Sequence, residues 1–405
     1  MSTFLKKMNL QSKKVLLRVD FNVPLSPEGK ILDDERLIRV LPTINYILSQ
    51  GASIILMSHL GRPGKKRLED GTIDINRYTL KHLVKPLTNL IKKEIQFASD
   101  CGSQESQSMA AKLESGDILL LENTRFVAGE TKGDKNFAKS LSKLGDVFIN
   151  DAFGTSHRAH ASTAIIANYF DAEHKGFGFL IEDELKNAEQ VLNNAKHPFV
   201  LILGGAKISD KIPLIEHFLD KADHIIIGGG MAYTFCKAQG GCIGNSLVQD
   251  DYLDLSIELL EKAKLAKVKI WLPQDSVIAD KFSADANTKI TSSFDILDDW
   301  MGLDIGPKAI NDFTNILKSA KTILWNGPMG VFEMSAFSKG TLALAQAIAD
   351  ATDNGAYSLI GGGDSASAVK KAGYADKVSY ISTGGGAMLT LLEGNPMPGL
   401  ESIKE

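Results

Sequence analysis

Short runs of apolar, often β-branched residues alternate along the chain with longer stretches whose apolar residues recur at helical spacing. This alternation is typical of parallel strands buried on both faces and connected by amphipathic helices. It predicts strands at residues 15–19, 53–57, 118–121 and 147–149 in the first half, and at 199–203, 224–227, 269–272, 322–325, 357–360 and 378–381 in the second. We therefore predict an α/β protein with two doubly wound, Rossmann-like parallel sheets.

Residues 181–192 separate the two sets of predicted strands. This stretch has apolar residues at helical spacing and contains neither glycine nor proline. We predict a stiff hinge helix there, between a first domain of residues 1–180 and a second domain of residues 193–390.

The composition narrows the class of protein. Apolar residues make up 44% of the chain and charged residues 23%, which is ordinary for a globular protein. The formal net charge of −4 argues against a general nucleic-acid binder, because such affinity rests on a cationic surface. The three cysteines form no zinc-binding or disulfide pattern, and no apolar run reaches the length of a membrane span or signal peptide. We expect a cytoplasmic protein that binds neither nucleic acid nor membrane.

Two residue types are distributed unevenly between the halves. All eight arginines lie in the first 158 residues, whereas 23 of the 36 glycines follow residue 200. A uniform domain would rarely separate these types, so we infer two domains with different ligands.

Basic residues follow the predicted strands of the first half. In open parallel sheets, ligands bind beyond the carboxyl ends of the strands. The residues there are 20–22, 59–62, 122–125 and 151–158, and they include three arginines and two histidines; Arg36 follows the first loop. A solvated surface is the alternative, but it does not explain why basic residues recur at the same topological position. Because arginine suits phosphate and carboxylate oxygens, we expect a small polyanion.

Glycine clusters follow the strands of the second half, at residues 204–205, 228–230, 327–330, 361–363 and 384–386. Glycine lets backbone amides approach a ligand closely, and a following helix N-terminus favours anions. One such pair is usually a tight turn, whereas five at one edge predict a nucleotide site. The chain lacks the GxxxxGK[ST] and GxGxxG patterns and the HRD and DFG signatures, so it is not a P-loop, dinucleotide-binding or protein-kinase sequence.

Three side chains lie among these glycines. Lys207 and Lys211 belong to the segment Gly-Gly-Ala-Lys-Ile-Ser-Asp-Lys and could bind phosphates or form a solvated helix face. Asp364 ends a glycine loop and could cap a helix or bind Mg²⁺. One domain for an anionic metabolite and one for a nucleotide suggest phosphoryl transfer with domain closure that excludes water.

Ten motifs across the chain resemble those of the phosphoglycerate kinase family. They are Arg18-Val-Asp-Phe-Asn-Val-Pro, His59-Leu-Gly-Arg-Pro, Leu121-Glu-Asn-Thr-Arg-Phe, Asn150-Asp-Ala-Phe-Gly-Thr-Ser-His-Arg-Ala-His, Gly204-Gly-Ala-Lys-Ile-Ser-Asp-Lys, Gly228-Gly-Gly-Met-Ala-Tyr-Thr-Phe, Trp300-Met-Gly-Leu-Asp-Ile-Gly-Pro, Trp325-Asn-Gly-Pro-Met-Gly-Val-Phe-Glu, Gly361-Gly-Gly-Asp-Ser and Thr383-Gly-Gly-Gly-Ala. The resemblance implies reversible phosphoryl transfer from 1,3-bisphosphoglycerate to MgADP, giving 3-phosphoglycerate and MgATP. It implies direct in-line transfer in a closed interdomain cleft, and a monomer whose tail, residues 391–405, packs on the first domain.

The resemblance also implies residue roles. The phosphoglycerate site would comprise Asp20, Phe21, Asn22, Arg36, His59, Leu60, Gly61, Arg62, Arg125 and Arg158. The nucleotide site would comprise Lys207, Lys211, Gly229, Gly302, Asn326, Glu333, Gly362, Gly363, Asp364 and Ser365, with Asp364 as the Mg²⁺ ligand. The amides of Gly384, Gly385 and Gly386 would receive the transferring phosphate, and Arg36, Lys207 and Lys211 would be catalytic. No protein nucleophile is needed, because the substrate oxygens attack directly.

Met388 stands where a small hydroxyl residue is expected, and the segment 170–179 is atypical. A catalytically silent binding protein is disfavoured because binding alone does not need Arg36, Lys207, Lys211 and Asp364 together. An NAD-dependent dehydrogenase is disfavoured because the GxGxxG pattern and its following acidic residue are missing.

Overall fold

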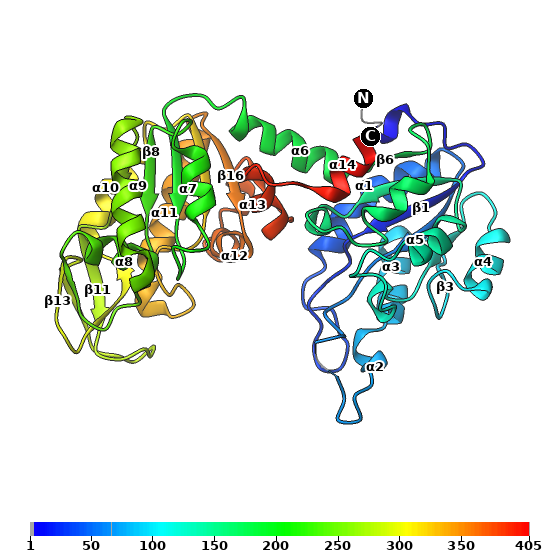
Figure 1. The fold of residues 1–405 in the computed structure, drawn as a ribbon, viewed down its shortest axis with the longest axis horizontal. Helices are drawn as coiled ribbons and strands as arrows, with labels where there is room; N and C mark the ends of the chain where they lie inside the picture. The colour runs from blue at the N-terminus through cyan, green and yellow to red at the C-terminus, as the bar shows by residue number, and fades with distance from the viewer. Residues whose placement is uncertain (1–3, 66, 405) are drawn as a thin grey trace. The chain divides into compact units, whose positions relative to one another are not determined.

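The computed structural model describes residues 4–65 and 67–404, and Figure 1 draws its ribbon. The chain forms two compact units, one of residues up to Leu185 together with those from Pro396 onward, the other of Lys186–Asn395. The division falls within α6, Phe179–Leu192, which begins two residues before the predicted hinge helix.

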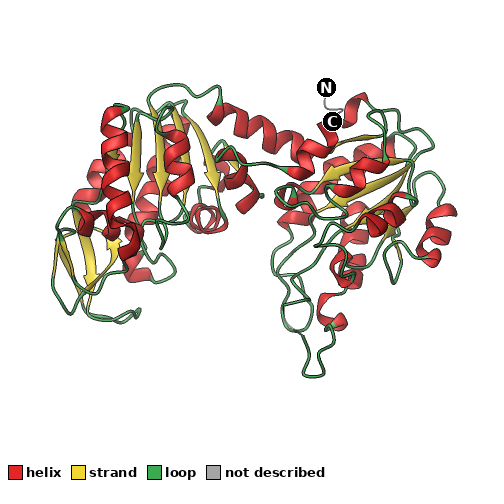
Figure 2. Ribbon diagram, in the orientation of Figure 1, coloured by secondary structure: helices red, strands yellow, loops and turns green. Residues whose placement is uncertain are grey.

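The first unit contains a six-stranded parallel sheet in the order β3-β4-β2-β1-β5-β6. Its central strands are buried along their length, as the continuous apolar runs predict. Helices cover both faces of the sheet (Figure 2). The strands are β1 Lys14–Val19, β2 Ser53–Met57, β3 Gln96–Phe97, β4 Ile118–Leu120, β5 Val147–Asp151 and β6 Lys175–Phe177, and the helices are α1 Glu35–Ser49, α2 Ile75–Tyr78, α3 Val84–Ile91, α4 Gln104–Ala111 and α5 Lys135–Ser142.

The second unit contains another six-stranded parallel sheet, in the order β10-β8-β7-β15-β16-β17. Its strands are β7 Phe199–Leu203, β8 His224–Ile227, β10 Lys269–Trp271, β15 Thr322–Asn326, β16 Tyr357–Gly361 and β17 Tyr380–Ile381. Its helices are α7 Ile212–Phe218, α8 Met231–Ala238, α9 Leu253–Leu265, α10 Pro307–Leu317, α11 Lys339–Asp353, α12 Gly363–Lys371 and α13 Gly386–Leu392. The α/β class with parallel sheets is therefore confirmed.

The second unit also contains a small sheet that the sequence pattern did not predict. Antiparallel strands β12 Thr288–Ser292, β11 Asp275–Ala279 and β14 Met301–Ile305 form it, beside the pair β9 Cys242–Ile243 and β13 Asp295–Ile296. Polar residues or glycine interrupt the apolar residues of β11 and β14, and β12 is largely exposed, so these strands lack the continuous apolar runs used for prediction. β3 and β6 were missed for the same reason of length; β6 lies in the atypical segment 170–179.

The start of α6 is held by buried polar groups of the first unit. Asp151 Oδ1 accepts a hydrogen bond from Ile181 N at 3.1 Å, and Thr43 Oγ1 accepts one from Phe179 N at 3.0 Å. Both contacts satisfy amides that a helix N-terminus leaves without a partner. Burial raises the pKa of Asp151 to about 7.

The last helix, α14 Pro398–Lys404, completes the first unit. Gly399 N donates to Ser156 O at 2.8 Å, and Asn150 Nδ2 donates to Gly399 O at 3.0 Å. Leu400 and Ile403 are buried. The tail is thus tied to the end of β5.

We expect Leu400→Ala to destabilise the first unit by about 2–4 kcal/mol, because Leu400 is 1% exposed and its loss leaves a cavity. Hydrogen exchange of the β5 amides measures the loss as reduced protection. Leu32→Ala, at a position that is 67% exposed, is the matched control. Equal protection in both variants would show that the tail does not support β5.

Candidate active site

In each six-stranded sheet the strand order reverses beside the first strand of that sheet. The reversal lies between β1 and β5 in the first unit and between β7 and β15 in the second. Loops leaving such neighbouring strands turn to opposite faces and open a crevice at the carboxyl ends. The loops after these four strands contain several of the predicted site residues, and others follow β2, β4, β16 and β17.

Asp20, just after β1, joins two predicted residues of the first unit. Its carboxylate pairs with Arg36, and its Oδ1 lies 3.8 Å from His59 Nδ1. Asp20 and His59 are buried, whereas the side chain of Arg36 keeps 34% of its surface exposed. The guanidinium of Arg36 is therefore held from one side and open to solvent on another.

The loops after β1, β2 and β4 are joined around Gly61. Asn22 Oδ1 accepts from Gly61 N at 2.7 Å, and Arg125 Nη1 donates to Gly61 O at 2.6 Å. Asn123 Nδ2 donates to Leu60 O at 2.8 Å. Phe21, also predicted, is buried and donates its amide to Ser58 Oγ at 2.9 Å.

Arg18, Ser162 and Glu130 form a buried polar network next to these loops. No role was predicted for these residues from the sequence. Arg18 is fully buried; its Nε donates to Ser162 Oγ at 2.9 Å, and its Nη2 lies 3.3 Å from His59 Nδ1. Ser162 in turn donates through Oγ to Glu130 Oε1 at 2.6 Å and through its amide to Oε2 at 3.0 Å. The buried Glu130 thereby balances Arg18 through a shared hydroxyl. The signal in the sequence was an arginine inside an otherwise apolar strand.

The histidines of this surface stay neutral. Burial, together with Arg18, Arg125 and Arg36, holds the pKa of His59 well below its usual range. Burial and Arg125, Arg18 and Arg158 lower the pKa of His160 to about 3. Burial and two neighbouring arginines lower the pKa of Arg125 to about 10, so it remains charged at neutral pH. The positive charge of the site therefore comes from its arginines.

Two predicted arginines stand apart from the hydrogen-bonded core of the site. Arg158 donates through Nε to His157 Nε2 at 3.0 Å and is linked to Arg125 by charge repulsion. Arg62 is exposed.

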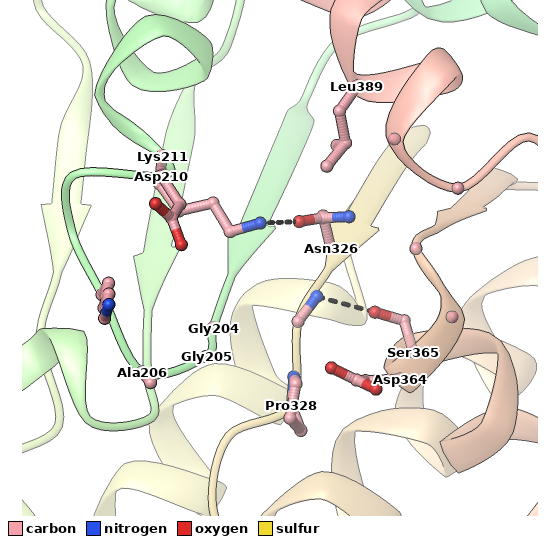
Figure 3. A pocket seen from close by; sticks show the side chains of 16 residues that line it. Gly204, Gly205, Ala206, Asp210, Lys211, Asn326, Pro328, Asp364, Ser365 and Leu389 are labelled. Carbon is pink, nitrogen blue, oxygen red and sulfur yellow. Dashed lines mark hydrogen bonds between the residues drawn. The ribbon is translucent and has the colours of Figure 1, made fainter. Parts of the chain in front are cut away.

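The second unit has a pocket of about 420 Å³ at its point of strand reversal (Figure 3). The loops after β7, β15, β16 and β17 supply its walls. Of the residues predicted for the nucleotide and the transferring phosphate, it is lined by Lys207, Lys211, Asn326, Gly362, Gly363, Asp364, Ser365, Gly385 and Gly386. Ala206, Asp210, Pro328 and Leu389 also line it.

Two glycine loops interlock at the floor of this pocket. A Cβ on Gly204 would lie 2.0 Å from Pro328 O, and one on Gly327 would lie 2.2 Å from Gly204 O. No side chain fits at such distances, so glycine is required at both positions. Gly204 N donates to Asn326 O at 2.9 Å, and Gly205 N donates to Pro328 O at 3.0 Å, which locks the two loops together.

Lys211 points across the pocket toward Asn326, as Figure 3 shows. Its Nζ donates to Asn326 Oδ1, and Asn326 Nδ2 donates to Gly361 O at 2.7 Å. Burial lowers the pKa of Lys211, and the nearby carboxylates Asp210, Glu393 and Asp364 oppose this effect. Lys207 is exposed and lines the same pocket.

Four predicted residues lie outside the lining of this pocket. Gly229 N donates to Met329 O at 3.0 Å, Gly302 N donates to Ser246 Oγ at 2.9 Å, and Gly384 N donates to Ser382 Oγ at 3.1 Å. Glu333 is exposed, at the end of the loop that begins at Asn326. Met388 is fully buried and Leu389 lines the pocket instead, so Met388 does not replace a polar group at the pocket wall.

Gln249 is a polar residue that the sequence analysis did not identify. Its Oε1 accepts from Ser209 N at 3.1 Å, and its Nε2 donates to Ser209 Oγ at 3.1 Å. Ser209 lies between Lys207 and Lys211, so both ends of one amide hold the segment that carries the lysines. A glutamine in an exposed-looking acidic stretch gave no signal in the sequence.

Within residues 4–65 and 67–404, no group of three or more His, Cys, Asp or Glu side chains is arranged to hold a metal ion. Asp364 and Asp210 line the pocket separately. This arrangement suits a cation that arrives already bound to phosphate oxygens, since Mg²⁺ needs few protein ligands in that case. Over the same described residues, every helix is too short or too polar to span a bilayer.

The two sites lie at the carboxyl ends of the two sheets. One site is rich in arginine, and the other consists of glycine loops with two lysines. Together they are typical of a two-domain α/β kinase. The sequence profile of the phosphoglycerate kinase family matches residues 5–395. The chain belongs to the phosphoglycerate kinase family, and it is an enzyme.

Relatives match this chain along almost its whole length. It is 52% identical to the phosphoglycerate kinase of Chloroherpeton thalassium over 396 residues, covering 98% of this chain and 97% of that protein. It is 48% identical to the cytosolic phosphoglycerate kinase of Nicotiana tabacum over 401 residues, covering 99% and 98%. The structure of phosphoglycerate kinase from Coxiella burnetii matches with a TM-score of 0.88 at 38% identity, covering 100% of this chain and 99% of that one.

We expect the free energy of unfolding of wild type, relative to that of His160→Gln, to decrease as the pH falls from 6.5 to 4.5. The folded pKa of His160 is depressed to about 3, so below pH 6.5 the unfolded chain gains a proton that the folded chain does not. Each pH unit costs up to about 1.4 kcal/mol per such histidine. Hydrogen exchange of the first unit across this pH range measures the difference. A constant difference would mean that His160 titrates normally when folded.

We expect Gln249→Ala to raise the nucleotide KM about 3- to 10-fold, because two hydrogen bonds to the lysine-bearing segment are lost. Gln249→Glu keeps the acceptor for Ser209 N and should recover most of the affinity. Steady-state kinetics with each nucleotide provide the measurement. If the two variants are equally impaired, the amide does not act through Ser209.

Proposed function

We propose that this chain catalyses reversible phosphoryl transfer between 1,3-bisphosphoglycerate and MgADP, giving 3-phosphoglycerate and MgATP. The observation that carries the proposal is the pocket in which two lysines stand among glycine loops and helix N-termini. α12 and α13 begin at Gly363 and Gly386, both in the pocket wall, where the free amides of a helix N-terminus would favour phosphate groups.

The arginine-rich site of the first unit supports 3-phosphoglycerate as the partner substrate. Arg36, Arg62, Arg125 and Arg158 offer planar pairs of donors for phosphate and carboxylate oxygens. His59 is neutral, so it can donate a hydrogen bond without adding charge. Asn22, Gly61 and Leu60 would shape the site through the loop contacts described above.

The protein contributes position and positive charge to the reaction. In phosphoryl transfer the attacking and leaving oxygens belong to the substrates, and the enzyme stabilises the charge on the equatorial oxygens. Lys211 is held by Asn326 and would exchange that neutral partner for a phosphate oxygen. Arg36 would pair with the transferring group, while Asp20 fixes its orientation.

Asp364 is the proposed Mg²⁺ ligand. It lines the pocket in the first turn of α12, beside Gly362 and Gly363. When bound with the nucleotide, the metal would supply positive charge that offsets the charge of the phosphates. Glu333 would bind the ribose, and Gly229 and Gly302 would lie on the adenine side. We also propose that the protein is a cytoplasmic monomer.

A coupled assay tests the proposed function directly. Purified protein, MgATP and 3-phosphoglycerate should release ADP, and omission of 3-phosphoglycerate should abolish the release. Release of ADP at the same rate without 3-phosphoglycerate would mean that the chain is an ATPase instead.

We expect Asp364→Asn to weaken the magnesium-bound nucleotide at least about 10-fold and the metal-free nucleotide much less. Asparagine caps a helix almost as well as aspartate, so the substitution separates metal binding from capping. Calorimetric titration with ADP, with and without Mg²⁺, measures both affinities. Equal losses would assign Asp364 to the cap.

We expect Arg36→Ala to lower kcat at least about 10²-fold while the KM for 3-phosphoglycerate changes much less, if the contact strengthens in the transition state. Arg36→Lys should recover only part of kcat, because it keeps the charge and loses the paired donors. Arg158→Ala should mainly raise KM. The measurements are kcat and KM at saturating MgATP, with direct binding data. Unchanged kcat with a raised KM in Arg36→Ala would contradict the catalytic role.

A further inference from the structure

Asp304, in the small antiparallel sheet, is a buried carboxylate held by backbone amides. It lies in β14 and is 2% exposed. Its Oδ1 accepts from Ile305 N at 2.9 Å, and its Oδ2 accepts from Gly340 N at 2.8 Å. Burial of an ionised carboxylate raises the free energy of the folded state unless hydrogen bonds compensate for it. A carboxylate buried near the pocket loops is therefore a candidate for a specific structural role.

The carboxylate is wedged between the pocket loop and α11. A Cβ on Gly330 would lie 2.3 Å from Asp304 Oδ1, and one on Gly340 would lie 2.4 Å from the same oxygen. Gly330 belongs to the loop that starts at Asn326, and Gly340 to the first turn of α11, which Figure 1 labels. Only glycine permits this approach from both sides.

Asp304 replaces a cap that α11 lacks locally. The residue at the N-cap position, Ser338, makes no side-chain capping bond and donates instead to Ser335 O at 3.0 Å. A carboxylate near the start of a 15-residue helix is favoured both by the free amides and by the helix dipole.

The first turn of α11 in turn holds the pocket loop. Thr341 Oγ1 accepts from Met329 N at 3.0 Å, and Leu303 O, next to Asp304, accepts from Val331 N at 2.9 Å. The same loop accepts bonds from the other glycine loops at Pro328 O and Met329 O. Asp304 therefore lies where β14, α11 and the loop that lines the pocket are joined.

We propose that Asp304 is a positioning residue for the nucleotide site, whose ionised carboxylate holds the start of α11 and the loop 326–333 in the shape that binds nucleotide. The inference rests on the proposed function for the identity of the nucleotide substrate. Asp304 itself contacts neither the pocket nor the reacting groups.

Titration of Asp304 gives the inference a measurable signature. Burial raises its pKa to about 7, while the two amides favour the ionised form. The buried phenol of Tyr233, whose pKa burial also raises, interacts with Asp304 electrostatically. Asp275 of β11 is turned to the start of α10, and Glu333 and Lys339 on the packed elements are exposed. Protonation removes the negative charge and makes one oxygen a weaker acceptor, so the hydrogen bond to one of the two amides is weakened.

The test compares Asp304→Asn with wild type in steady-state kinetics from pH 6.0 to 8.5. Asparagine keeps the shape and presents one donor group to the amides, as the protonated acid does. At pH 8 we expect the KM for MgATP to rise at least about 5-fold and the KM for 3-phosphoglycerate to change less than about 2-fold. The KM ratio of variant to wild type should fall toward 1 at pH 6. Taking this ratio cancels the titration of the nucleotide itself.

Asp275→Asn is the matched control. Asp275 lies on the neighbouring strand and caps α10 through Lys308 N at 3.0 Å and Ala309 N at 2.8 Å. In the described part of the chain, no hydrogen bond joins α10 to residues 326–333. This variant should leave both KM values unchanged at every pH. Equal effects of the two variants on the MgATP KM, or a ratio that does not vary with pH, would overturn the inference.

A second variant tests the loop without touching the carboxylate. Thr341→Val removes the acceptor of Met329 N and keeps the shape, so it should raise the MgATP KM at pH 8, where Asp304 is ionised. An unchanged KM would overturn the proposed route through α11. Wild-type protein that shows no 3-phosphoglycerate-dependent turnover would contradict the proposed function instead, and ADP calorimetry on the same variants then tests Asp304 independently of turnover.

Discussion

The nucleotide pocket of the second unit depends on close backbone contacts between the loops that follow β7 and β15. Gly204 and Gly327 approach so closely that neither position has room for a Cβ, and the amides of one loop bond to the carbonyls of the other. This contact closes the floor between β7 and β15, where the strand order reverses. The lysines, Asn326 and the amides of α12 and α13 can then converge on one space. A side chain at either glycine would separate the loops before any ligand contact was lost.

In the first unit the main constraint is electrostatic, because several arginines lie close together. Like charges at short range repel one another and raise the free energy of the folded state, and burial of these charges raises it further. Glu130, bonded to Ser162, and Asp20, paired with Arg36, offset part of the repulsion. Keeping His59 and His160 neutral avoids adding to it. The resulting surface is positive at neutral pH without depending on histidine titration.

Sequence patterns predicted the parallel sheets and much of the candidate site for a physical reason. Buried parallel strands are continuous apolar runs, and their carboxyl ends mark where ligands bind, so Asp20, Lys207 and Asp364 could be found from position alone. The resemblance to the family added residues such as Gly302 and Glu333, which no strand end marked.

What could not be predicted depends on contacts distant in sequence. The strands of the small sheet mix apolar residues with polar residues and glycine, and β12 is largely exposed, so no continuous apolar run marked them. Arg18, Gln249 and Asp304 act through partners that lie 144, 40 and 36 residues away, respectively. Such partnerships exist only once the fold brings the residues together. Burial then gives them their importance, and burial of a single polar residue is not visible in a local pattern.

The central claim is that the phosphoryl group passes directly between the two substrates, with no side chain as an intermediate carrier. The stereochemical course at phosphorus tests it most directly. The purified chain is given MgATP made chiral at the γ-phosphorus with oxygen isotopes, together with 3-phosphoglycerate, and the configuration of the acyl phosphate product is determined. Direct in-line transfer predicts inversion. Retention would require two successive transfers through a group on the protein and would contradict the account.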